Sequence, residues 1–311
     1  MPTSERPAEA HWSERAERGS FWGLWFVLQL YRILGRRGLY LLLYPIIAYF
    51  YLTNPTARRH SRQFLERVYE YGGLAQPPRA RDLFRHFFNF GESMVDRLAG
   101  WAGDWPDQAI RIIDNEPLMS QMDSGRGALV ISSHLGNIEM SRLLPDDYGW
   151  RIHPLVYQAH APGINRLLKQ ANPDADLNLI DISNFGPHTG VELEAVLDRG
   201  QCIAIAGDRT PPGLSRHVAW ADFLGKPAPF PTGPFVLAAL LRCPVYLLHC
   251  VKDAQGYRVE VERLTTQVTL ARRSRQEDLQ YWVGQYARAL EARVLQDPLQ
   301  WFNFYDFWNQ S

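Results

Sequence analysis

The chain has 311 residues, enough for one large α/β domain or two smaller ones. Its 33 basic and 33 acidic residues give a formal net charge of +0, so no overall positive charge favours a nucleic-acid partner, and we expect none. The three cysteines, Cys202, Cys243 and Cys250, lie in or beside apolar strand-like segments. An odd number in such surroundings favours buried free thiols. Because no CxxC or HExxH motif occurs, we expect neither a metal nor another cofactor.

The N-terminal region indicates membrane association. Residues 1–20 are polar, and no small-residue cleavage site follows an apolar core, so they do not form a signal peptide. Residues 21–52 are rich in Trp, Tyr, Leu and Ile, with three interrupting arginines. The longest uncharged run, 38–53, is shorter than the ~20 residues of a simple spanning helix, and Pro45 is expected to kink it. We expect a helical pair lying in one leaflet; two buried helices of a soluble domain remain the alternative.

The remaining chain alternates between patterns typical of strands and of helices. Two helices are expected first, at 55–72 and 79–99. The expected strands are 110–113, a strand ending at His134, 152–157, 177–182, 202–206, 245–251 and 257–261. The expected helices between and after them are 117–124, 164–170, 190–198, 234–241 and 275–296. This order predicts an α/β fold, a mostly parallel sheet flanked by helices. We expect a polar tail (1–20), a helical membrane-associating region (21–104) and an α/β domain (105–311).

Two later segments have unusual composition. Residues 210–233 are rich in Pro and Gly, which predicts a long loop or lid whose apolar members could line an acyl groove. Residues 301–308 are too aromatic to remain in water. We expect them to pack back on the body of the protein or on the membrane.

The central strand ends in Ser133-His134-Leu135-Gly136-Asn137-Ile138-Glu139. Open α/β sheets bind ligands at the carboxyl ends of their strands. His134 can accept a proton from a hydroxyl near neutral pH, and a carboxylate such as Glu139 can fix its tautomer. No nucleophilic Ser, Cys or Lys lies in an obvious motif beside it, which favours direct transfer to a substrate hydroxyl. The spacing also occurs by chance, so the spacing alone does not settle catalysis.

Further candidate residues follow neighbouring strands. Gly207 lets the chain turn closely after the strand at 202–206, and Asp208 and Arg209 come next. Arg209 could hold a phosphate or offset an oxyanion, or the Asp–Arg pair could simply close a turn. Gln158 and Arg166 follow a third strand and are expected to reach the same crevice.

Together these motifs resemble the glycerolipid acyltransferase superfamily. The segment from His134 to Glu139 fits its H-x4-D/E motif. Gly207-Asp208-Arg209-Thr210, Phe223-Leu224-Gly225-Lys226-Pro227-Ala228 and Pro231-Thr232-Gly233-Pro234 resemble later blocks of its lipid A biosynthesis (lauroyl/myristoyl) branch. The resemblance covers about residues 20–310 in consistent order, and it identifies the chain as a divergent member of that branch.

The resemblance implies an acyltransferase that moves a fatty acyl group from an acyl carrier protein, or less favourably acyl-CoA, to a hydroxyl of a membrane glycolipid or related lipid acceptor. Such enzymes work at the cytoplasmic face of the bacterial inner membrane. It implies His134 as the general base and Glu139 as its partner. Gly136, Asn137 or Arg209 would provide oxyanion donors, and Asp208 and Arg209 would belong to the substrate pocket.

The sequence differs from the lipid A branch at two positions, and these differences bear on the identity of the acceptor more than on the acyl transfer reaction. Gln158 stands where the lipid A enzymes usually carry an arginine, and Arg209 replaces the glutamine of their common Gly-Asp-Gln block. A lysophospholipid or glycerol-phosphate acyltransferase is therefore the first alternative. A non-catalytic lipid-binding protein of the same fold is the second, and a hydrolase that passes the acyl group to water is the third.

Overall fold

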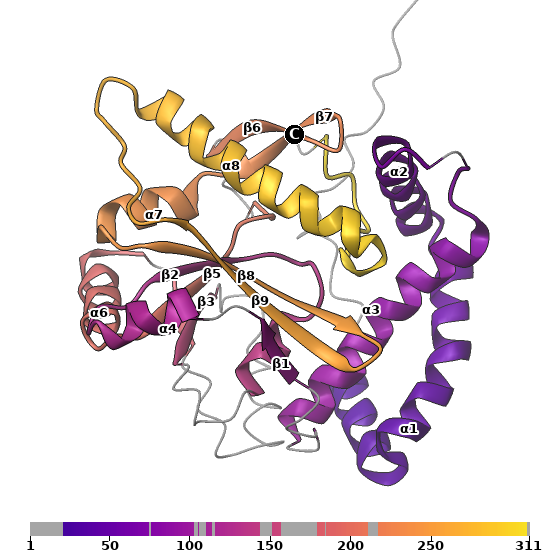
Figure 1. Cartoon of the computed structure of the whole chain (residues 1–311). Helices are drawn as coiled ribbons and strands as arrows, with labels where there is room; N and C mark the ends of the chain where they lie inside the picture. The colour runs from indigo at the N-terminus through magenta and orange to yellow at the C-terminus, as the bar shows by residue number, and fades with distance from the viewer. Residues whose placement is uncertain are drawn as a thin grey trace, which may run out of the picture.

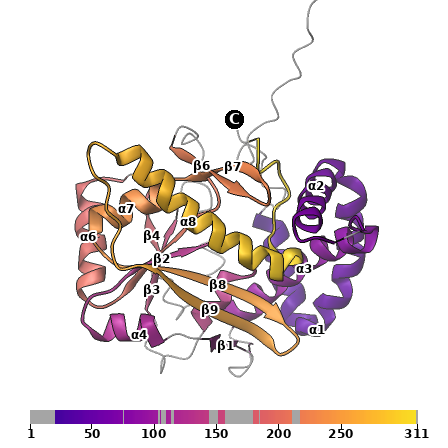
Figure 2. The same cartoon turned by 45° about the horizontal axis from the view of Figure 1, so that its top comes forward.

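A computed structural model describes residues 21–309 except 75, 103–104, 106–109, 114–115, 144–150, 157–178, 184 and 211–216. At its centre lies a seven-stranded sheet with strand order β1-β9-β8-β2-β5-β3-β4 (Figures 1 and 2). The strands are β1 (Ile110–Ile113), β2 (Leu129–Ser132), β3 (Ile152–Val156), β4 (Ile180–Asp181), β5 (Cys202–Ala206), β8 (Val245–Asp253) and β9 (Gly256–Thr265). Within this sheet only the β8–β9 hairpin is antiparallel. The predicted mostly parallel α/β fold is confirmed.

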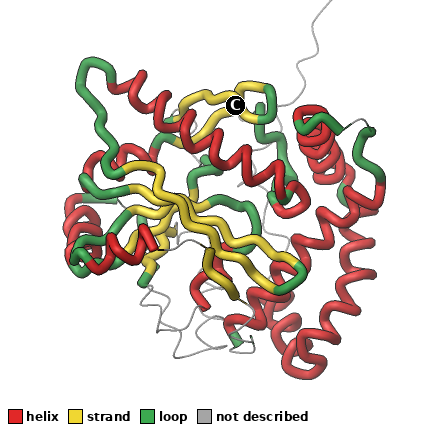
Figure 3. The backbone as a smooth tube through the Cα atoms, viewed as in Figure 1, coloured by secondary structure: helices red, strands yellow, loops and turns green. Residues whose placement is uncertain are grey.

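Helices pack on both faces of the sheet (Figure 3). They are α4 (Glu116–Asp123), the 3₁₀ helix η2 (Ile138–Leu143), α6 (Pro187–Asp198), α7 (Gly233–Leu241) and α8 (Arg275–Gln296). All four residues of β2 are buried, and successive side chains of a strand point to opposite faces of the sheet. Both faces of the sheet must therefore be packed against other elements. Leu129 and Ile131 pack in a core shared with α6, α7 and α8, whereas Val130 packs in a second core with Leu118 of α4.

The first three helices lie together at one side of the sheet (Figures 1 and 2). They are α1 (Phe21–Thr53), α2 (Pro55–Tyr71) and α3 (Ala80–Trp101). The first is two helices joined at Gly35, whose φ of 64° lies in the left-handed region that favours glycine. A pair of helices was therefore a correct expectation, but the break falls at Gly35 and the helix continues through Pro45.

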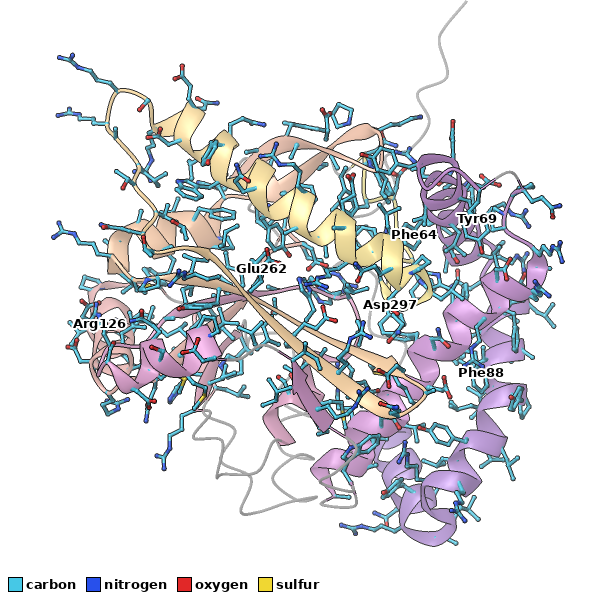
Figure 4. The ribbon with its side chains drawn as sticks, viewed as in Figure 1. Phe64, Tyr69, Phe88, Arg126, Glu262 and Asp297 are labelled. Atoms are coloured by element: carbon cyan, nitrogen blue, oxygen red, sulfur yellow. The ribbon has the colours of Figure 1, made fainter. Side chains whose placement is uncertain are left out.

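One side of α1 packs on α3, and another side is apolar and exposed. Leu39, Leu43 and Ile47 are buried against α3, where Phe88 lies between the two helices (Figure 4) and its ring centroid is 4.5 Å from that of Tyr44. From residue 29 onward, where the side chains of α1 are described, the large exposed apolar ones are Ile33, Leu34, Leu41, Tyr44, Ile46, Tyr49, Phe50 and Leu52. In the described part of the chain, Gln29–Thr53 is long and apolar enough to cross a membrane, with a mean hydropathy of 1.2. This helix could therefore associate with a membrane.

Most predicted elements coincide with observed ones, including β1, β5 and α8. The expected strand at 177–182 is reduced to the two residues of β4, and part of that range lies outside the described residues. The expected helix at 164–170 lies wholly outside them. The three cysteines are buried free thiols, as predicted.

The prediction of a structureless loop at 210–233 is wrong for its central part. Residues of β6 (Val218–Phe223) and β7 (Lys226–Pro231) form a hairpin, closed by Leu224 and Gly225 at φ values of 52° and 75°. The three prolines of β7 occupy every second position of the strand. None of them therefore needs to donate a backbone N–H to the hydrogen bonds between β6 and β7. Phe223 and Phe230 are fully buried in the main core, so they line no open groove.

Candidate active site

His134 and Asp208 meet at the carboxyl edge of the sheet. β2 and β5 are parallel neighbours, and their last residues, Ser132 and Ala206, are paired in register. His134 and Asp208 each come two residues after these strand ends, so the register brings together side chains that are 74 positions apart in sequence. The prediction that both stand at the same edge is confirmed.

The contact between them is a double hydrogen bond. Asp208 Oδ1 lies 2.8 Å from His134 Nδ1, and Asp208 Oδ2 accepts the His134 backbone N–H at 2.8 Å. The Asp208 side chain is 1% exposed, whereas that of His134 is 37% exposed. The carboxylate therefore holds the imidazole from inside the protein, and Nδ1–H donation to Asp208 leaves the lone pair on Nε2.

The surroundings keep His134 neutral and Asp208 charged. Burial, and then the positive charge of Arg209, lower the pKa of His134 below its ordinary 6.5, although Asp208 opposes this shift. Burial alone would raise the pKa of Asp208, but the charge and hydrogen bonds of His134, with Arg209, lower it to about 2. At neutral pH the pair is thus an uncharged imidazole on a carboxylate, the state that a general base requires.

Trp301, which no local motif marks as a site residue, contacts the pair as a third member. The indole Nε1 of Trp301 donates to Asp208 Oδ2 at 3.0 Å, and Trp301 is 2% exposed. The segment around Trp301 is fixed to the loop that carries His134, since Leu135 and Trp301 form a β-bridge and Phe302 N donates to His134 O at 3.2 Å. The expectation that the aromatic segment packs on the body of the protein is confirmed. Only its aromatic composition was visible in the sequence, not its contact with Asp208.

The backbone donors after His134 are already used. Gly136 N–H donates to Gln300 O at 2.8 Å, and Asn137 N–H donates to Cys250 O at 2.7 Å. Gly136 has a φ of +73°, and a Cβ there would lie 2.0 Å from Cys250 O, so no other residue fits. These two N–H groups therefore shape the loop and are not oriented for an oxyanion, which corrects that expectation.

Gly207 and Arg209 flank Asp208 and have different functions. A Cβ on Gly207 would lie 2.6 Å from Ile131 Cγ2 and 2.8 Å from Tyr286 Cζ, so the predicted close turn is real. Arg209 Nη2 donates to Phe302 O at 2.9 Å, and its guanidinium lies 5.6 Å from the centre of the Tyr305 ring. Arg209 is therefore a half-buried cation held beside the pair, and it does not simply close a turn with Asp208.

Glu139 does not hold the position that the H-x4-E spacing suggested. It lies in the first turn of η2, half-buried, while Asp208 is the carboxylate at Nδ1 of His134. The assignment of Glu139 as the group orienting Nδ1 is thus corrected: the chain turns at Gly136 directly after the histidine, and the neighbouring strand supplies the carboxylate. Gln158 and Arg166 lie outside the described residues.

The comparisons with known proteins identify the family of the chain. The sequence matches the family described as bacterial lipid A biosynthesis acyltransferase over residues 19–310. No curated protein matches the chain. Among solved structures, the 1-acyl-sn-glycerophosphate acyltransferase PlsC from Thermotoga maritima is similar at 14% identity and a TM-score of 0.36, covering 84% of this chain and 95% of that one. Since the family match spans nearly the whole chain, the protein belongs to the bacterial lipid A biosynthesis acyltransferases and is an acyltransferase enzyme.

Proposed function

We propose that the protein transfers a fatty acyl group from an acyl carrier protein thioester to a hydroxyl of a membrane glycolipid or related lipid acceptor, with His134 as the general base. The observation that carries this proposal is the His134–Asp208 pair at the sheet edge. A partly exposed imidazole whose other nitrogen is fixed by a buried carboxylate is suited to taking a proton from a hydroxyl.

In the proposed reaction, Nε2 of His134 accepts the hydroxyl proton as the acceptor oxygen attacks the thioester carbonyl. The imidazolium that forms is stabilised by Asp208, the role that the sequence pattern gave to Glu139. The tetrahedral intermediate then collapses, the C–S bond breaks, and the imidazolium returns the proton to the leaving thiolate. The products are the acyl ester and the free thiol of the carrier.

Arg209 is the group we propose for stabilising the oxyanion. It lies close enough to His134 for its charge to lower the pKa of the imidazole. The backbone N–H groups of Gly136 and Asn137 are occupied, which leaves this cation as the best supported of the three predicted donors. Each oxyanion donor contributes roughly 10²–10³ to the rate in well-studied acyl transfer enzymes.

The site of action that we propose is the cytoplasmic face of the bacterial inner membrane. The exposed apolar side of α1 supports membrane contact. In this arrangement residues 21–104 hold the enzyme on the bilayer, and residues 105–311 carry the chemistry.

The test compares wild type with His134→Ala. The donor is an acyl carrier protein thioester or acyl-CoA with a radiolabelled acyl group, and the three acceptors are a glycolipid, a lysophospholipid and glycerol phosphate. Loss of the base should lower turnover by about 10²–10⁴-fold. His188→Ala, at an exposed histidine, should match wild type. Retained turnover in a folded His134→Ala protein would refute the mechanism. Transfer only to the lysophospholipid or to glycerol phosphate would show that the protein is an acyltransferase for that acceptor. Transfer only to water would show that it is a hydrolase.

A further inference from the structure

His86 of α3 is a buried imidazole that the proposed reaction does not use. Its Nε2 lies 2.9 Å from the backbone carbonyl oxygen of Trp301, and its Nδ1 lies 2.8 Å from Oγ of Ser61 on α2. His86 and Ser61 are both 0% exposed. One imidazole therefore connects two helices of the N-terminal region to the residue whose indole contacts Asp208.

The two hydrogen bonds fix the tautomer of the His86 ring. Burial lowers the pKa of His86 from 6.5 to about 4, so the ring is neutral at neutral pH. A carbonyl oxygen can only accept, so Nε2 must carry the proton and donate it to Trp301 O. Nδ1 then keeps its lone pair, and the hydroxyl of Ser61 donates to it. The ring is thus oriented by α2 and donates an N–H to the main chain of Trp301.

The hydrogen bonds continue from Trp301 to the candidate active site. The Trp301 indole donates to Asp208 Oδ2 at 3.0 Å, and Asp208 Oδ1 accepts from His134 Nδ1. The path from Ser61 to Asp208 is buried throughout, since each of its four members is 2% exposed or less. A displacement of Trp301 would consequently weaken the bond to the carboxylate, because hydrogen bonds depend steeply on distance and angle.

The contacts of Trp301 show what His86 adds to its position. Asn303 N–H also donates to Trp301 O, at 2.7 Å, but it belongs to the same segment and moves with it. His86 stands on a separate helix, and its ring stacks on that of Phe304 at a centroid distance of 4.6 Å. Phe64 of α2 contacts the Trp301 indole, with centroids 5.0 Å apart (Figure 4). The two helices therefore support this segment in addition to its β-bridge with the loop after β2.

We propose that His86 is a positioning residue for acyl transfer: by donating to the carbonyl of Trp301, it keeps the indole on Asp208 and so holds this carboxylate in place for His134. The inference rests on the proposed function, because it assigns a further residue to that mechanism. It also gives the N-terminal helical region a role besides membrane contact, since α2 and α3 supply Ser61 and His86. Small displacements of catalytic groups lower the rate strongly, which is why such support matters.

The test compares variants of the full chain in phospholipid nanodiscs. His86→Phe keeps an aromatic ring and removes both hydrogen bonds of the imidazole. His86→Gln retains an N–H donor for Trp301 O, since Nε2 of glutamine is as many bonds from the backbone as Nε2 of histidine. Ser61→Ala is the matched control, because it removes the other hydrogen bond of His86 and leaves the donation to Trp301 O in place.

The measurements are kcat and KM for an acyl carrier protein thioester, the midpoint of thermal unfolding, and the indole N–H resonance of Trp301 in ¹⁵N-labelled protein. This resonance is assigned by its loss in Trp301→Phe, and it reports the bond to Asp208 because donation to a carboxylate moves an N–H proton downfield. We expect His86→Phe to move it upfield and to lower kcat roughly tenfold, with KM changed less than about twofold. His86→Gln should restore both the resonance and kcat. Ser61→Ala should lower the midpoint while leaving the resonance and kcat close to those of wild type.

An unmoved Trp301 resonance in His86→Phe would overturn the proposal. An equal loss of kcat in His86→Phe and Ser61→Ala would also overturn it, by showing a role in stability alone. If His86→Phe does not fold, His86→Asn replaces it, because its shorter amide can accept from Ser61 but ends one atom short of Trp301 O. The expected shift of the resonance in a protein whose wild type transfers no acyl group would refute the proposed function alone, and the position of the carboxylate would still depend on His86.

Discussion

Two buried aspartates, Asp208 and Asp96, show how different partners give one side chain different functions. Asp208 is 1% exposed and accepts hydrogen bonds from N–H groups of His134 and Trp301. Asp96 is fully buried, about 40 residues before His134, and its partners are Arg36, Lys252 and the hydroxyls of Tyr40 and Tyr257.

The two aspartates differ in whether their partner carries a positive charge all the time or only after it takes up a proton. Burial alone would lower the pKa of Lys252, but Asp96 raises it, so that ion pair is permanent. Asp96 therefore ties α1, α3 and the β8–β9 hairpin together. The partner of Asp208 at Nδ1 is an imidazole that is neutral at rest and gains charge only when it takes a proton. The first arrangement suits a structural tie, and the second suits catalysis.

The largest expected effect is on turnover, and it distinguishes the role of Asp208 from that of Glu139. Asp208→Asn can donate its amide N–H to Nδ1, which moves the imidazole proton to Nε2 and removes the base. We expect turnover of acyl carrier protein thioester to fall by about 10²–10⁴-fold. Glu139→Gln, the matched change at the residue suggested by spacing, should lower it less than about tenfold, since Asp208 still fixes the tautomer. The reverse order of the two variants would return the orienting role to Glu139.

The next effect concerns stability. Asp96→Ala leaves Arg36 and Lys252 as partly buried cations without their carboxylate, and it removes an acceptor of two phenols. We expect the free energy of unfolding to fall by about 3–5 kcal/mol, measured by denaturant titration. Asp123→Ala, at an exposed position, should change it by no more than about 0.5 kcal/mol. Equal stability of the two variants would show that the tie is dispensable.

The smallest effect is a shift in pH dependence, which is measured by the position of the acid limb and is separate from any loss of rate that follows from the proposed oxyanion role of Arg209. In the proposed mechanism the neutral imidazole of His134 is the active form, and Arg209 contributes, after burial, to the lowered pKa of His134. Arg209→Gln should therefore raise that pKa, and the acid limb of kcat/KM should move to higher pH. Lys226→Gln, at the exposed lysine that begins β7, should leave the limb in place, because this lysine is not among the charges that shift the pKa of His134. An unmoved or lowered limb in Arg209→Gln would contradict the electrostatic role given to this arginine.

The sequence predicted those features that depend on local pattern. Continuous apolar runs marked β2 and β5 as buried strands, and the turn residues after them marked one edge of a parallel sheet. The hairpin of β6 and β7 was missed because Pro and Gly normally indicate a loop, and only the register shows that its prolines fall where no ladder bond is needed.

The partner of His134 could not be predicted from spacing. Glu139 is close in sequence, but Asp208 is brought to the histidine by the pairing of Ser132 with Ala206, a tertiary fact. Trp301 reaches the same carboxylate from 93 positions further along the chain. Local sequence patterns therefore marked His134 as the proposed base, and only the packing of distant segments identified the groups that orient its imidazole.

The bond from Trp301 to Asp208 also has a consequence for synthesis of the protein. On the ribosome, His134 and Asp208 emerge well before the indole that completes their arrangement. A nascent chain can thus form its sheet and reach the bilayer through α1 while its carboxylate still lacks that donor. The order of translation would delay acyl transfer until the aromatic segment has docked, so activity would begin only on a chain that has folded through Trp301.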